Sequence, residues 1–235
     1  MPICSKHLLP TLALGLIVTA QATEECATAV QCNQVGSAAY QSGRYKQAIE
    51  AFERQLRRAE GSDTAQFELA LNNLILTHLR AGDAGMARAC LEVALDNNLS
   101  GSSTRLHLTK VAEALDYQAL AASPVGRYLR YGGQAVWSEV EITPDPQGGY
   151  RASFSPLRAG ARVEEYGPAA IGGLEGKLEG DAVQMRLQDA GPNSDCAVQL
   201  LREGIELRVL EVFAEGCQNY GGAGISVAGD YIKVR

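Results

Sequence analysis

Glycine is distributed very unevenly along this chain of 235 residues. Residues 23–131 contain seven glycines, whereas residues 132–235 contain seventeen, although the two stretches are nearly equal in length. Glycine weakens helices and is typical of turns, so the first stretch can hold long helices and the second must change direction often. The sequence therefore predicts an α+β, multidomain protein, in which a short antiparallel helical array precedes a small antiparallel β-barrel or sandwich.

Two features mark the boundary between these halves. Ser123-Pro124 ends the last clear helical pattern, because proline disfavours helix in the residue before it. Gly132-Gly133 follows shortly afterwards. We therefore expect a helical domain over 23–123, a linker over 124–133 and a β domain over 134–235.

The helical half contains an internal repeat. In the segment 35–56, small, turn-forming and apolar residues stand at the spacings of a tetratricopeptide repeat: Gly36, Gly43, Tyr45, Ala48, Phe52 and Leu56. A looser copy follows over 71–98, with Gly82 in the place of Gly43 and Ile75 where a small residue is expected. This half resembles the tetratricopeptide-repeat (TPR) family, which implies antiparallel helical hairpins that turn at Gly43 and Gly82.

Two further features belong to the expected array. Asp63, in the loop before the second copy, is expected to cap the next helix. A fifth helix should follow the second copy, with apolar residues on one face: Leu108, Val111, Ala112, Leu115 and Ala119. Such arrays usually need about three units for independent stability. Two units and one helix must therefore lean on the second domain, on a partner chain, or on both.

The TPR resemblance also implies a function, because the inner face of each first helix recognises a protein or peptide partner in that family. Asn33 and Asn72 share one repeat position and can hydrogen-bond a peptide backbone. Arg80 is the one cation on this face, so a partner segment that ends in a carboxylate is not favoured. In the alternative reading, the leucines simply pack against the fifth helix or the β domain. Carried over residue by residue, the resemblance gives Asn33, Ser37, Tyr40 and Gln41 from the first copy, and Asn72, Leu76, Leu79 and Arg80 from the second.

The second half shows the alternation of polar and apolar residues that is typical of half-buried strands. A strand over 161–166 would place Glu164 and Glu165 on opposite faces, so they could not act as a catalytic pair. The expected strands cover 135–142, 150–157, 161–166, 182–187, 197–201, 205–212 and 223–235.

The end of the chain carries a second, short resemblance. Cys196, Cys217 and the closing run GGAGISVAGDYIKV resemble the C-terminal part of small secreted β-barrel proteins of the lysozyme-inhibitor-like group. The resemblance implies an inhibitor or immunity-type protein that blocks a cell-wall-active enzyme. Asn219 and Tyr220, in the loop 213–222, would then insert into that enzyme.

The N-terminus reads as an export signal. Lys6 precedes a nearly apolar run from Leu8 to Ala20, and Ala20-Gln21-Ala22 fits a cleavage site. The run is shorter than the roughly 20 residues that a spanning helix needs. We expect a signal peptide over 1–22, bacterial in style, that sends the chain to the periplasm or outside the cell with no stable membrane span. The alternative is an uncleaved N-terminal anchor.

The cysteines fit an exported chain. Removal of Cys4 leaves an odd number of cysteines, so at least one is unpaired or bonded outside the chain. Cys196 and Cys217 are expected to pair in an oxidising compartment. Cys26 is expected to pair with Cys32, and Cys90 then acts as a small buried apolar residue. In the alternative, Cys32 pairs with Cys90 and Cys26 stays free.

The remaining composition argues against several function classes. Twenty-one basic and 27 acidic residues give a net charge of −6, which does not favour a nucleic-acid partner. His78 and His107 lack the spacing of metal ligands, and no nucleotide-binding or hydrolase motif occurs. We therefore expect no metal, no cofactor and no catalysis. The main hypothesis is an exported, non-catalytic protein-interaction module, a periplasmic adaptor or scaffold.

Overall fold

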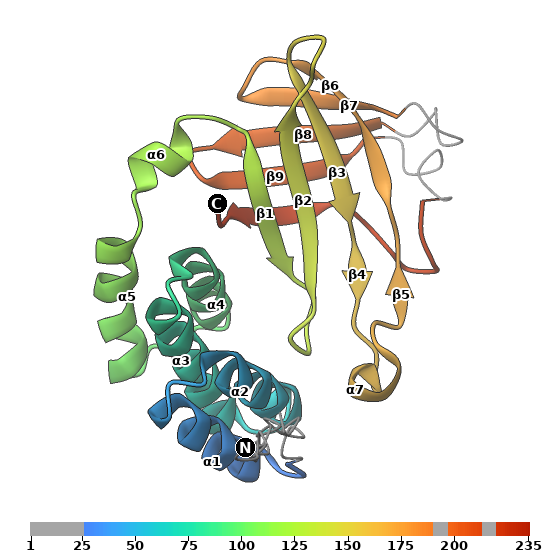
Figure 1. Cartoon of the computed structure of the whole chain (residues 1–235). Coiled ribbons are helices and arrows are strands. Elements are labelled where there is room, and N and C mark those ends of the chain that lie inside the picture. The colour runs from blue at the N-terminus through green and yellow to red at the C-terminus, as the bar shows by residue number, and fades with distance from the viewer. Residues whose placement is uncertain (1–25, 190–196, 213–219) are drawn as a thin grey trace, which may run out of the picture.

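The computed structural model describes residues 26–189, 197–212 and 220–235. These residues form an array of helices followed by a closed β-barrel (Figure 1), which confirms the predicted fold class and selects the barrel over the sandwich. The helices of the array are α1 (Ala29–Gln41), α2 (Tyr45–Ala59), α3 (Thr64–Arg80), α4 (Ala84–Asp96), α5 (Ser102–Ala114) and the short α6 (Tyr117–Ala121).

The first four helices form two antiparallel hairpins, as the repeat predicts. The backbone has positive φ at Gly43 (70°) and at Gly82 (80°), a conformation that favours glycine. A Cβ atom on Gly36 would stand 2.5 Å from the Phe52 ring, so only glycine allows α1 and α2 to approach this closely. Asp63 caps α3 by accepting a hydrogen bond from the backbone N–H of Gln66 (3.0 Å).

The fifth helix forms, but its buried face differs from the predicted one. Thr104, His107 and Val111 are the buried residues of α5, whereas Leu108 and Ala112 are exposed. The reason is that α3 offers polar partners to this face. The side chains of Glu68 and Asn72 bind Thr104, and that of Asn72 also binds His107, as described below.

The barrel is antiparallel and closed in the order β1-β10-β9-β8-β7-β6-β3-β2, with β1 pairing with both β10 and β2. Apolar side chains fill its interior, among them Tyr128, Ile142, Phe154, Leu200 and Leu207. Its strands are β1 (Gly126–Tyr131), β2 (Trp137–Pro144), β3 (Tyr150–Ser155), β6 (Leu174–Gly180), β7 (Gln184–Asp189), β8 (Ala197–Glu203), β9 (Glu206–Glu211) and β10 (Gly229–Lys233).

Two sequence predictions about this half are wrong, and one strand was missed. The expected linker over 124–133 contains β1, a full strand of the barrel. Residues 163–166 form a helical turn, α7 (Val163–Tyr166), between the short strands β4 (Leu157–Arg158) and β5 (Ala170–Ile171), so the segment 161–166 is not a strand. The strand over 174–180 was not predicted, because its sequence LEGKLEG combines glycine with charge.

The helical array packs against the outside of the barrel. Ala89 of α4 lies in one apolar cluster with Leu129 of β1 and Ile232 of β10. A methyl group on Gly85 of α4 would overlap the carbonyl oxygen of Val234. The array therefore leans on the second domain, as its small number of repeats predicts.

Polar contacts reinforce this junction at both ends. The Glu60 carboxylate at the end of α2 accepts hydrogen bonds from the Tyr131 hydroxyl (2.9 Å) and from the backbone N–H of Gln134. At the other end, the Lys233 ammonium donates to the carbonyl oxygens of Leu120 (2.9 Å) and Ser123 (2.7 Å). Both contacts join residues more than 70 positions apart in the chain.

Candidate binding face

The barrel contacts only one side of the helical array in the described part of the chain. α2 and α4 lie toward the barrel, whereas α1, α3 and α5 follow one another along the side away from it (Figure 1). Within the described residues, α5 packs against part of α3. The described residues of the barrel do not cover the first helices of the two repeats.

A small hollow lies on that uncovered side, between α1 and α3. Its volume is about 160 Å³. Four of the residues predicted to bind a partner meet here: Ser37, Tyr40, Gln41 and Leu76. Sequence reasoning missed three more, Phe52, Asn73 and Thr77. We call this set of residues the α1–α3 hollow.

The two repeated asparagines hydrogen-bond residues of neighbouring helices. The Asn33 side-chain oxygen accepts a hydrogen bond from the Asn73 amide (2.8 Å). The Asn72 side-chain oxygen lies 2.9 Å from Nδ1 of His107, and its amide donates to Thr104 (3.2 Å). Asn33 therefore joins α1 to α3, and Asn72 joins α3 to α5.

Asn72 is consequently unsuited to partner binding. Its side chain is only 8% exposed. Burial lowers the pKa of His107 below its usual value, and the nearby Lys110 lowers it further, so the ring is neutral at neutral pH. A neutral ring can donate from Nδ1 to the Asn72 oxygen. The neighbouring Asn73, half-buried, takes the place in the hollow that the repeat alignment assigned to Asn72.

The other two predicted residues of α3 lie outside the hollow. Leu79 is partly buried and packs against the core of the helical array. Arg80 is exposed at the last position of α3. Asn73 and Leu76 are three residues apart, so they lie on the same outer face of α3. This spacing could have shown that Asn73, one residue after Asn72, belongs to the uncovered face.

Of the predicted inhibitory loop 213–222, the structure describes residues 220–222, and the one side chain among them that was predicted to insert, Tyr220, is buried. Tyr220 is only 6% exposed, and its hydroxyl donates to the Glu211 carboxylate (2.6 Å). The same carboxylate oxygen accepts from Ser226 (2.8 Å) and from the backbone N–H of Val227 (2.9 Å). The expectation that Tyr220 inserts into an enzyme is therefore wrong. Asn219, Cys196 and Cys217 lie outside the described residues.

The carboxylate of Glu211 is held in its charged form. Burial raises its pKa, but the hydrogen bonds from Tyr220, Ser226 and the backbone outweigh burial and hold the pKa below its usual range. Glu211 thus acts as a charged acceptor that ties Tyr220, Ser226 and the backbone of Val227 together.

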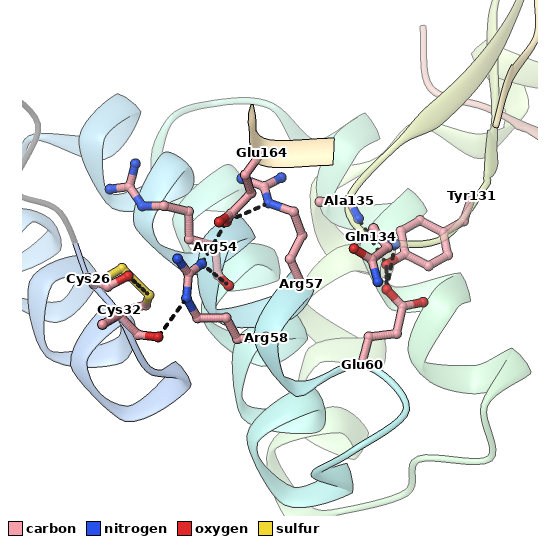
Figure 2. A network of polar contacts seen from close by, with 11 residues as sticks. Cys26, Cys32, Arg54, Arg57, Arg58, Glu60, Tyr131, Gln134, Ala135 and Glu164 are labelled. Carbon is pink, nitrogen blue, oxygen red and sulfur yellow. Dashed lines mark hydrogen bonds and ion pairs between the residues drawn. A yellow bond between two sulfur atoms is a disulfide. The ribbon is translucent and has the colours of Figure 1, made fainter. Parts of the chain in front are cut away.

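A third polar network joins the N-terminal segment, α2 and α7 (Figure 2). Cys26 and Cys32 form a disulfide, as predicted, and Cys90 is a free, buried thiol whose pKa is raised by burial. Arg58 donates from Nε to the carbonyl oxygen of Ala27 (3.1 Å) and from Nη1 to Glu164 (2.6 Å). Because Cys32 is bonded to Cys26, its alternative pairing with Cys90 is excluded.

Glu164 joins the segment around α7, between β4 and β5, to the helical array. Arg57 also donates to its carboxylate, at 3.1 Å, so two arginines of α2 share one acceptor (Figure 2). Burial alone would raise the pKa of Glu164, but the hydrogen bonds from Arg58 and Arg57 outweigh it and lower the pKa. The network is a structural clamp between the two halves.

The described residues hold neither a candidate metal site nor a candidate membrane span. No group of three or more histidine, cysteine, aspartate or glutamate side chains among them is placed to hold a metal ion. No helix in the same residues has the length and apolar character needed to cross a membrane. Comparison of the chain with known protein families, with curated proteins and with solved structures found no match.

Proposed function

We propose that this chain is an exported, non-catalytic protein-interaction protein that binds a segment of a protein or peptide along the face of α1 and α3. The observation that carries the proposal is the docking side of the barrel. The barrel stabilises the array from the side of α2 and α4 and leaves the α1–α3 hollow uncovered by described residues. The apolar start of the chain and the Cys26–Cys32 disulfide support export to the periplasm or beyond.

The chemistry of the hollow favours a peptide as its ligand. Ser37, Gln41 and Asn73 offer hydroxyl and amide groups that both donate and accept hydrogen bonds, as a peptide backbone requires. Tyr40 and Leu76 supply apolar surface for one small side chain. A volume of about 160 Å³ suits such a side chain rather than a whole cofactor.

A peptide selection tests this proposal. Residues 23–235 would be used to select binders from a displayed library of random peptides, and the affinities of the selected peptides would be measured by fluorescence polarisation. The variant Gln41→Ala/Leu76→Ala shortens one polar and one apolar side chain of the hollow. The matched control, Gln118→Ala/Leu210→Ala, makes the same two changes at exposed positions of α6 and β9.

We expect the hollow variant to weaken binding at least tenfold and the control to bind like the parent chain. A loss of this size corresponds to about 1.4 kcal/mol, which a lost hydrogen bond and a lost apolar contact together can supply. Peptides that bind both variants equally well, or a selection that yields no peptide, would refute a binding role for this face.

The inhibitor hypothesis remains the alternative. It depends on the loop 213–222, of which Tyr220 is buried and residues 213–219 are not described. A direct assay separates the two proposals. An inhibitor would reduce the rate of a cell-wall-degrading enzyme whether or not Gln41 and Leu76 were changed.

A further inference from the structure

A second cavity lies at the junction between the two halves, away from the α1–α3 hollow. It is a cleft of about 430 Å³ between α4 and the outer wall of β1, β9 and β10. Leu129 and Ile232 supply apolar lining, and Trp137, the one tryptophan of the chain, also borders it. The Trp137 ring meets the Tyr131 ring edge-on, with 5.1 Å between the centroids. We call this space the junction cleft.

Carboxylates outnumber cations around the junction cleft. Glu92 pairs with Arg88, and Asp230 pairs with Arg208 at 2.8 Å. Two further carboxylates, Asp96 of α4 and Glu206 of β9, border the same space. Neither carboxylate makes a hydrogen bond or a close ion pair within the described part of the chain.

The cations of the cleft are already engaged. Arg130 also borders the space, but its terminal nitrogens donate to the carbonyl oxygens of Ser226 (2.9 Å) and Ala228, and its guanidinium lies over the Tyr231 ring. The negative charges of Asp96 and Glu206 also act on the guanidinium of Arg88, but the ion pair of Arg88 is with Glu92. The side chains that remain available to a ligand are therefore acidic.

The end of α4 makes this site more negative. The last four carbonyl groups give the C-terminal end of a helix a partial negative charge, so acids there are unfavourable and bases are preferred. Asp96 is the last residue of α4, and its last turn contains no basic residue. The charge of Asp96 and the helix end thus add together beside Glu206.

We propose that the junction cleft binds a lysine or arginine side chain of a protein partner. The aliphatic stem would lie on Leu129, Ile232 and the Trp137 ring, and the cationic end would meet Asp96 and Glu206. Long basic side chains combine an apolar stem with a charged end in this way, and aromatic rings attract cations. This site is separate from the α1–α3 hollow and does not rest on the function proposed above.

The single tryptophan makes the site directly observable. The probe is a blocked tetrapeptide of alternating leucine and lysine, and its twin carries glutamate in place of lysine. Both are titrated into residues 23–235 while the fluorescence of Trp137 is followed. The test variant is Asp96→Asn/Glu206→Gln. The control, Glu113→Gln/Glu175→Gln, removes the same number of charges at exposed positions of α5 and β6.

The lysine peptide should give a saturable change in Trp137 fluorescence that weakens as salt is raised, because exposed charges are screened. Its affinity should fall about tenfold in the test variant, since two charge-assisted contacts are lost, and stay unchanged in the control. Absence of a saturable change, an equal response to the glutamate twin, or equal affinity in the two variants would each overturn the proposal. The hollow variant Gln41→Ala/Leu76→Ala should bind the lysine peptide normally, so the two proposals can fail independently.

Discussion

Replacement of Asn72 by alanine tests how the helical array is held together. The Asn72 side chain contacts His107 (2.9 Å), Thr104 (3.2 Å) and the backbone carbonyl of Glu68 (3.0 Å). Thr104 keeps a second partner, because its hydroxyl also donates to the Glu68 carboxylate (2.8 Å). His107, only 5% exposed, would keep no hydrogen-bond partner for Nδ1. The main cost of the substitution is therefore one unsatisfied buried nitrogen.

The magnitude follows from that cost. An unsatisfied buried polar group costs about 1–3 kcal/mol, so we expect Asn72→Ala to lower the free energy of unfolding by about 2 kcal/mol. For a chain of this length, that is a fall in Tm of roughly 4–8 °C. Asn73→Ala is the matched control, because it removes the same side chain at the next position. Its bond to Asn33 is only partly buried, and we expect a loss of about 0.5 kcal/mol.

Urea unfolding followed by far-UV circular dichroism measures both values. A double-mutant cycle between Asn72→Ala and His107→Ala should give a coupling energy of about 1 kcal/mol or more. Equal losses for Asn72→Ala and Asn73→Ala, or additive effects of Asn72→Ala and His107→Ala, would refute the claim that the repeated asparagine joins neighbouring helices.

Two further predictions concern the junction and the response to pH. Gly85→Ala should destabilise the chain by about 1–3 kcal/mol in denaturant unfolding, because the new methyl group overlaps the carbonyl oxygen of Val234. Gly173→Ala, where a Cβ atom meets nothing within 4 Å, should be nearly neutral. His78 and His107 both have pKa values lowered by burial from about 6.5, so the unfolded chain binds protons more readily than the folded chain. The contribution of these two neutral rings to the free energy of unfolding should therefore be fully present above about pH 6.5. It should be lost as the pH falls below that value. An unfolding free energy that does not change between pH 7.5 and pH 5.5 would contradict the neutral, buried state of both rings.

Local signals predicted the helical half well. Gly43 and Gly82 mark turns because their backbone conformation is disfavoured for other residues, and Asp63 marks a helix start because its side chain can accept a backbone N–H. These effects depend on a few neighbouring residues, so they are visible in sequence. The same reasoning failed for β1, where the sequence GRYLRY gives weak alternation and the strand forms through its pairing with β2 and β10.

The candidate site shows the same division. The repeat alignment identified Ser37, Tyr40, Gln41 and Leu76, which meet in one hollow, because helical spacing alone places them on the outer faces of α1 and α3. It misjudged Asn72, because the repeat position does not reveal that His107 of the next helix will bury it. The buried face of α5 was misjudged for the same reason.

The sequence by itself determined the order of the elements, the two helical hairpins and the β character of the second half. Helix caps, glycine turns and alternating polarity act over a few residues, so they need no tertiary contact to be recognised. Only the tertiary structure decided which side of the array the barrel covers. That choice depends on contacts between distant residues, such as Glu60 with Tyr131 and Gly85 with Val234. Those contacts leave one face of the array uncovered by described residues and create the cleft at the junction, and both candidate binding sites follow from them.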